Sequence, residues 1–136
     1  MAPAHDTDTT FRVRSNSGGT VIEVCGNTVR VARRELVAST TVYELEPRET
    51  LRGLAELFRS VADDWRGWDG RRIWSSIEGE FKVAAQHDGL GTVELIVTLA
   101  QVVPTPTGTW SATASIYVDA GALDEIARSA RAFAEM

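Results

Sequence analysis

Cysteine and lysine are almost missing from this chain. Cys25 is the single cysteine among 136 residues, so an internal disulfide and a cysteine zinc cluster are both excluded. A chain without disulfides suits a reducing compartment, and we expect a cytoplasmic protein. Free cysteines usually pack as small apolar residues, so we expect Cys25 to be packed. Lys82 is the single lysine, and arginine carries the remaining basic charge, as GC-rich coding would give.

A net positive charge is also missing, because 19 Asp and Glu residues outnumber 14 Lys and Arg residues and give a formal net charge of -5. Nucleic acids and anionic membranes are bound through clustered Lys and Arg, so the sequence predicts neither as a partner. Residues 1–10 have neither a basic start nor an apolar run, which predicts a disordered tail and not a signal peptide. With 43% hydrophobic and 24% charged residues, residues 11–136 are expected to form a single globular domain.

The common signatures of catalysis are missing as well. The chain has no Gly-x-Ser-x-Gly elbow, no His-Glu-x-x-His pair and no phosphate-binding glycine loop. Nucleophilic catalysis would have to rely on Cys25 with His5 or His87. Adjacent His87 and Asp88 would point apart at the end of a strand, so they predict a turn and not a catalytic dyad. We therefore predict no cofactor and no metal, and favour a protein that is not an enzyme.

The first half of the chain predicts four strands and a helix. Residues 11–15 and 20–25 flank a turn, Gly26-Asn27 predicts a tight hairpin before residues 28–31, and residues 38–45 form a fourth strand. A helix is predicted for residues 47–65, because apolar residues recur there at spacings of three and four.

The second half predicts three long strands and a helix, at 73–86, 92–102, 110–118 and after an N-cap at Asp119. The alternation in 73–86 places Ile73 and Ile77 in the core and Trp74 outside. The expected fold is an α+β two-layer sandwich, with an antiparallel sheet of about six to seven strands and two helices on one face, in the order ββββαβββα. The repeated order suggests a structural duplication.

Large apolar side chains are predicted on the sheet face that the helices leave open. Trp74, Ile96 and Tyr117 share this face, and the segment from Trp68 to Arg72 adjoins it, whereas Trp110 points inward. Exposed apolar clusters mark binding sites, and Trp, Tyr and Arg dominate interface hot spots. The predicted partner-binding residues are Trp68, Arg71, Trp74, Glu78, Glu80, Ile96 and Tyr117. The alternative is that Trp68 and Trp74 close the end of the core.

Three carboxylates on the same face, Glu78, Glu80 and Glu94, have two interpretations. They form a solvated polar face around Lys82, or they carry acid–base chemistry or bind a hard cation. The solvated face needs no further assumption.

The open face and the space between sheet and helices lead to three functional hypotheses. The first is a non-enzymatic domain that binds a partner protein through the open face. The second is a small-molecule binding protein or minor enzyme, with a pocket lined by Trp65, His87 and Trp110. The third is a homodimer formed through the aromatic face.

Residues 65 to 135 resemble known families of small domains. Trp68-Asp69-Gly70, Trp74, Glu78-Gly79-Glu80, His87-Asp88-Gly89 and Trp110, followed by a helix that ends near Phe133, resemble a family of small uncharacterised domains from GC-rich bacteria. The layout also looks like that of bacterial immunity proteins, cytosolic antidotes that bind and block a toxin domain. The resemblance implies the fold and an antidote function, and it assigns no catalytic residue.

Overall fold

The computed structural model describes residues 10–16, 18–42, 47–102 and 108–135, with the backbone alone for residues 47–50. The tail predicted for residues 1–10 lies outside this range apart from Thr10, which begins the first strand.

The first half of the chain forms an antiparallel meander. Its strands are β1 (Thr10–Arg14), β2 (Val21–Cys25), β3 (Thr28–Arg33) and β4 (Leu36–Thr41), and each pairs with the next in sequence. Cys25 pairs with Thr28, so Gly26 and Asn27 form the two-residue turn that the sequence predicts. Gly26 has a φ of 60°, the left-handed conformation that this type of turn requires.

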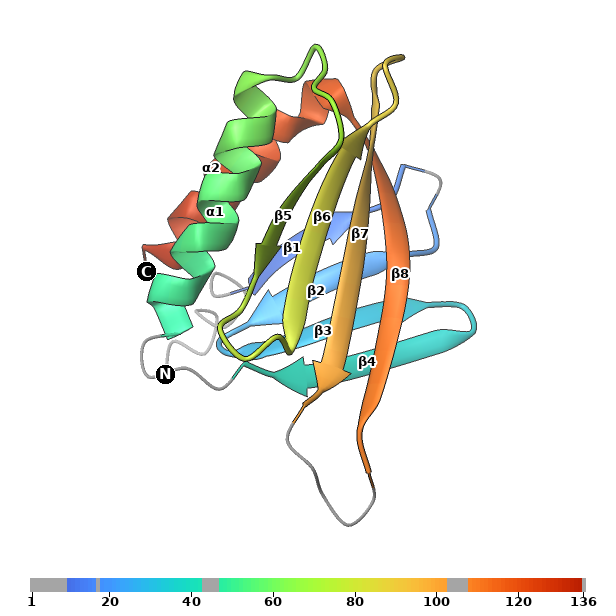
Figure 1. Ribbon diagram of the computed structural model, residues 1–136, viewed down its shortest axis with the longest axis vertical. Helices are drawn as coiled ribbons and strands as arrows, with labels where there is room; N and C mark the ends of the chain where they lie inside the picture. Colours follow the sequence, from blue (N-terminus) through green and yellow to red (C-terminus); the bar gives the residue numbers. More distant parts are fainter. Residues whose placement is uncertain (1–9, 17, 43–46, 103–107, 136) are drawn as a thin grey trace, which may run out of the picture.

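The second half repeats this plan. Helix α1 (Pro47–Asp63) leads to a second meander of β5 (Arg71–Ser75), β6 (Phe81–His87), β7 (Thr92–Gln101) and β8 (Trp110–Asp119). A short 3-10 helix, η2 (Ala120–Ala122), then precedes α2 (Leu123–Ala134). The element order is therefore four strands and a helix, twice (Figure 1).

The fold class is α+β, as predicted, but the single sheet of six to seven strands was wrong. The described strands form two sheets of four. The eighth strand arises within 73–86, which is a hairpin and not one strand. Ser76 donates its backbone N–H to Phe81 O at 2.8 Å, and Gly79 turns the chain with a φ of 84°. Glycine adopts this φ without strain, so Gly79 allows the chain to reverse between β5 and β6.

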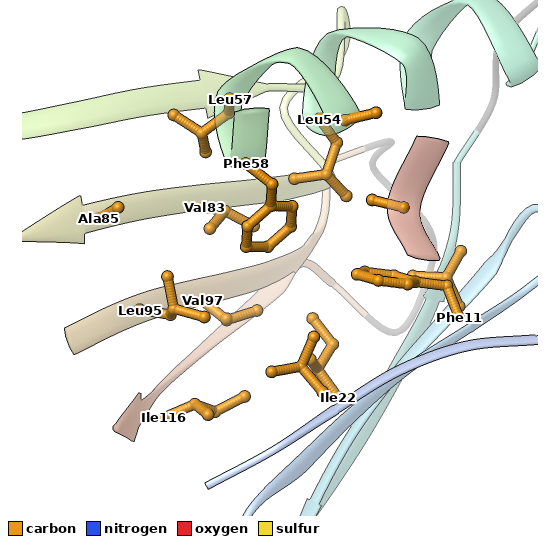
Figure 2. Close-up of a cluster of buried hydrophobic side chains, with 14 of the residues drawn as sticks. Phe11, Ile22, Leu54, Leu57, Phe58, Val83, Ala85, Leu95, Val97 and Ile116 are labelled. Atoms are coloured by element: carbon orange, nitrogen blue, oxygen red, sulfur yellow. The ribbon is translucent and has the colours of Figure 1, made fainter. Parts of the chain in front are cut away.

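One core is shared by both sheets and both helices. Figure 2 shows Phe11 and Ile22 of the first sheet, Val97 and Ile116 of the second, and Phe58 of α1 directed toward one another. The helices pack against each other, with α1 beside β5 and α2 beside β1, so together they close one side of the space between the sheets (Figure 1). Each large side chain buried there contributes about 1.5–3 kcal/mol to folding.

Helix α1 joins the core through an apolar stripe, as its spacing predicts. Leu54, Phe58 and Val61 are buried, and the Phe58 ring meets Phe11 of β1 edge-on at a centroid distance of 5.8 Å. This edge-to-face contact is a favoured aromatic geometry, and it ties α1 to the first sheet.

Two local predictions were wrong. Cys25 is exposed, because it ends β2 on the outer face of the first sheet. Asp119 precedes η2 and makes no side-chain cap bond, while the N-cap of α2 is Ala122. The Asp119 carboxylate instead accepts a hydrogen bond of 3.0 Å from Asn16 Nδ2, which ties the β1–β2 turn to the end of β8.

Candidate functional site

The outer face of the β5–β8 sheet carries an apolar row across three strands. Ile73 pairs with Ala84, Ala84 with Ile96 and Ile96 with Ser115. Ile73 is 61% exposed and Ile96 is half-buried, while Ala84 is buried between them. In Figure 1 this sheet lies in front of the first sheet, and both helices lie beside its β5 edge and leave the outer face uncovered.

Polar rows border the apolar row on both sides. Arg71 Nε donates to Gln86 Oε1 at 3.1 Å, and Glu94 Oε2 accepts hydrogen bonds from Ser115 Oγ at 2.6 Å and Tyr117 Oη at 3.4 Å. The opposite row includes Lys82 and a hydrogen bond of 3.1 Å between the hydroxyls of two threonines, Thr98 and Thr113. An apolar centre with a hydrogen-bonding rim is the usual anatomy of a protein interface.

Trp74 lies on the opposite face from the one predicted. Its ring meets Phe81 edge-on at 5.1 Å and packs against the core, and its indole closely approaches Gly53 of α1. The turn at 76–80 is the reason, because it pairs Trp74 with the inward-facing Val83. Ile73 and Ile77, predicted in the core, are exposed for the same reason.

The three glutamates are not brought together on the open face. Glu80 is buried, and its Oε1 accepts a hydrogen bond of 2.6 Å from Ser76 Oγ. Ser76 Oγ also accepts from the Phe81 N–H at 3.2 Å, so the pair holds the β5–β6 turn. Glu78 is exposed in that turn, and Glu94 alone lies within the open face. Glu80 is therefore inaccessible to a partner.

Trp68 supports the core from the end of the second sheet. Its Nε1 donates to Ala85 O at 3.3 Å, its ring meets His87 edge-on at 5.3 Å, and the Arg72 guanidinium lies 5.2 Å from its centroid. Arg72 also pairs with Asp64 at 2.7 Å. These contacts agree with the alternative in which Trp68 and Trp74 close the end of the core. Of the predicted partner-binding residues, Arg71, Ile96 and Tyr117 lie on the open face.

The three residues of the predicted ligand pocket do not meet. His87 Nε2 lies 2.9 Å from Trp65 O, so these two residues are neighbours. Trp110 begins β8 opposite Gln101, whereas His87 pairs with Val93, which in turn pairs with Val118 at the other end of β8. Eight residues of strand separate positions 110 and 118, a distance of about 27 Å at 3.4 Å per residue.

The His87–Asp88 segment holds a turn through hydrogen bonds, as predicted. Gly89 N donates to His87 Nδ1 at 2.8 Å, so the neutral ring carries its proton on Nε2 and donates it to Trp65 O. Asp88 Oδ1 accepts from the backbone N–H groups of Leu90 and Thr92 at 2.6 and 3.0 Å. These two N–H donors hold the pKa of Asp88 below its usual value.

The sequence did not predict two hollows that the structure contains. One, of about 490 Å³, runs between α1 and α2 and is lined by four arginines, including Arg59 and Arg128, which both pair with Asp124. The other, of about 570 Å³, lies beside Ser115 and Tyr117 of β8 and is bounded by residues of the β1–β2 and β3–β4 turns. Neither has a local signal, because each forms between segments far apart in the chain.

The described residues contain no group of three or more His, Cys, Asp or Glu side chains arranged to hold a metal ion. Over the same residues, no helix is both long and apolar enough to span a bilayer.

Comparison with known proteins gives a family. The chain matches the model of DUF6228, a family of unknown function, over residues 4–136, and it belongs to that family. No curated protein and no solved structure matched the chain.

Proposed function

We propose that this member of the DUF6228 family is a non-enzymatic protein-binding domain whose partner docks on the outer face of the β5–β8 sheet. The observation that carries the proposal is the apolar row of Ile73, Ala84 and Ile96, in which Ile73 is exposed and Ile96 is half-buried and which neither helix covers. Apolar surface of this kind gains stability when a partner removes it from water.

The border of the row supplies specificity. Arg71 and Tyr117 flank it, and residues of these two types contribute heavily to interface hot spots. Their hydrogen bonds to Gln86 and Glu94 hold the side chains in place before binding, which lowers the entropy lost on association. The net charge of -5 favours a partner that is basic overall.

The narrower proposal is an immunity-type antidote that acts in the cytoplasm and blocks a toxin domain. The strand–helix layout and the acidic chain are its support. The small-molecule alternative loses support, because Trp65 and His87 lie at the other end of the second sheet from Trp110.

A pair of matched variants tests the open face. Ile73→Arg places a charge in the apolar row, while Val37→Arg places the same charge on the outer face of the first sheet, where Val37 is 62% exposed. The partner is first recovered by a pull-down with the wild-type chain. We expect Ile73→Arg to weaken binding of this partner by roughly thirtyfold, equivalent to about 2 kcal/mol, and Val37→Arg to leave the affinity unchanged. If the Ile73→Arg variant and the wild type bind the partner with equal affinity, the partner does not dock on this face.

The antidote proposal has its own test. The chain is co-expressed with the product of the neighbouring open reading frame, and growth is measured. We expect wild type and Val37→Arg to relieve growth arrest and Ile73→Arg to fail. If the neighbouring product does not arrest growth, or if Ile73→Arg protects as well as wild type, the antidote proposal is wrong.

A further inference from the structure

Within the described residues, strand β8 has one backbone edge that pairs with no other strand and to which the β1–β2 turn hydrogen-bonds at Tyr117. It is the outermost strand of its sheet and pairs with β7 alone in the described chain. Near its end, the Tyr117 N–H donates to Ser15 Oγ at 3.1 Å and Tyr117 O accepts from the Asn16 N–H at 2.7 Å, so the backbone of Tyr117 points away from β7. In an antiparallel ladder this direction recurs at every second residue. The backbone groups of Ser111, Thr113 and Ser115 therefore also point outward.

Nothing in the sequence of this edge protects it from pairing. Residues 110–118 contain no charged residue and no proline, and the register with β7 is continuous from Thr92–Asp119 to Gln101–Trp110. Exposed edge strands normally carry lysine, proline or a bulge, which block the addition of another strand. An edge without them is suited to receive one.

The two ends of this edge complement each other. Trp110, at the beginning of β8, is 39% exposed. The hollow of about 570 Å³ lies at the other end, beside Ser115 and Tyr117, and Gly18 and Gly19 of the β1–β2 turn form part of its wall. One chain thus offers both an exposed aromatic side chain and a hollow with room for one.

We propose that two copies of this chain join β8 to β8, antiparallel, about a two-fold axis at Thr113. In this register Thr113 lies opposite Thr113 of the second copy, and Ser111 lies opposite Ser115. The outward backbone groups of these residues then pair across the axis.

The same register carries each Trp110 to the hollow of the other copy. It places Trp110 opposite Ile116, next to Ser115 and Tyr117. Trp110 alternates with Ala112, Ala114 and Ile116 and so belongs to the inner face, the side from which the turns of the first sheet approach β8. Residues 110–118 carry no charge, so the paired strands meet without like-charge repulsion, while Arg33, Arg34 and Glu35 line part of the hollow that receives Trp110.

This inference does not rest on the proposed function. Edge pairing leaves Ile73 and Ile96 uncovered and extends the outer face across both copies. It is measured on the purified chain alone, so either proposal can fail while the other stands.

Sedimentation of the purified full chain over a concentration series tests the pairing. We expect wild type to approach twice the 14.8 kDa of one chain. Thr113→Glu and Thr113→Lys should each weaken association by about tenfold, because like charges meet on the axis. An equimolar mixture of the two variants should restore the dimer. Failure of the mixture to restore it, or a wild type that stays monomeric at all concentrations, would overturn the proposal.

A second pair of variants tests the hollow. Trp110→Ala should weaken the dimer, whereas Trp65→Ala, at a tryptophan that is 49% exposed on another element, should leave it unchanged. Ile73→Arg should also leave it unchanged. If Ile73→Arg abolishes the dimer and Thr113→Glu does not, the copies meet through the open face, and the edge pairing is wrong.

Discussion

Gly53 is the position where a single methyl group best tests the reversed orientation of Trp74. Gly53 lies within α1, and a Cβ added there would lie 2.6 Å from Trp74 Nε1 and 3.0 Å from Trp74 Cδ1. The indole has little room to retreat, because its ring already meets Phe81 edge-on at a centroid distance of 5.1 Å. Ala at position 53 would therefore force either the ring or the helix to move.

Two opposing effects decide whether Gly53→Ala raises or lowers the free energy of unfolding. Replacing glycine by alanine inside a helix stabilises the fold by about 1 kcal/mol, whereas overpacking a core contact costs about 1–3 kcal/mol. We expect Gly53→Ala to lower the free energy of unfolding by about 1 kcal/mol. In a Trp74→Leu background the contact is gone, so the same change should raise the free energy of unfolding by about 1 kcal/mol. The two positions should thus be coupled by about 2 kcal/mol.

Urea unfolding followed by far-UV circular dichroism measures all four members of this cycle. Gly121→Ala is the control, because a Cβ there meets nothing within 4 Å and should not destabilise the fold. Equal stabilisation by Gly53→Ala in the wild type and in the Trp74→Leu background would refute the reasoning. That result would indicate that Trp74 lies on the outer face of the sheet and does not contact Gly53.

Three further changes test the local structure. Ser76→Ala removes the hydrogen-bond donor to the buried Glu80 and should lower the free energy of unfolding in urea by about 1–3 kcal/mol. As a control, Ser129→Ala at an exposed position should stay within about 0.5 kcal/mol of wild type. Asp88→Ala should lower the urea midpoint at pH 7. The folded pKa of Asp88 lies below that of an unperturbed aspartate, about 3.9, so the stability difference should be full above that pH and shrink as the pH falls through the folded pKa. A difference that stays constant with pH would contradict the role of the Leu90 and Thr92 donors. Cys25 should react completely with a thiol reagent in the native state, and protection until unfolding would contradict its outward orientation.

The sequence predicts the elements of this fold better than their orientation. The Gly26-Asn27 turn and the α1 stripe are local patterns, and the structure confirms both. The direction of Trp74 depends instead on where the β5–β6 turn begins, because a shift of one residue exchanges the faces of a strand. Ser76-Ile77-Glu78 keeps the alternation of a strand, and only Gly79 marks the turn.

The candidate site was partly accessible to the same reasoning. Ile96 and Tyr117 lie on the long β7 and β8 strands, where the alternation is unbroken, and their outward directions follow from it. Ile73 was missed because its face depends on the β5–β6 turn. The hollow beside β8 has no linear signal at all, since residues from three separate segments form it.

Both sheets have an outer face away from the core, and each outer face carries an apolar row, Val21, Ala32 and Val37 on the first sheet and Ile73, Ala84 and Ile96 on the second. The charged groups beside the two rows differ. On the first sheet, Glu23 pairs with Arg12 at 2.6 Å and with Arg30 at 3.1 Å, and Arg12 above all lowers the pKa of Glu23. A partner covering this network would have to remove three charges from water, and their mutual attraction offsets only part of that penalty. On the second sheet, the centre is the uncharged row of Ile73, Ala84 and Ile96, and covering it releases water from apolar surface. Desolvation therefore favours the second sheet for binding, and the matched Ile73→Arg and Val37→Arg variants compare the two faces directly.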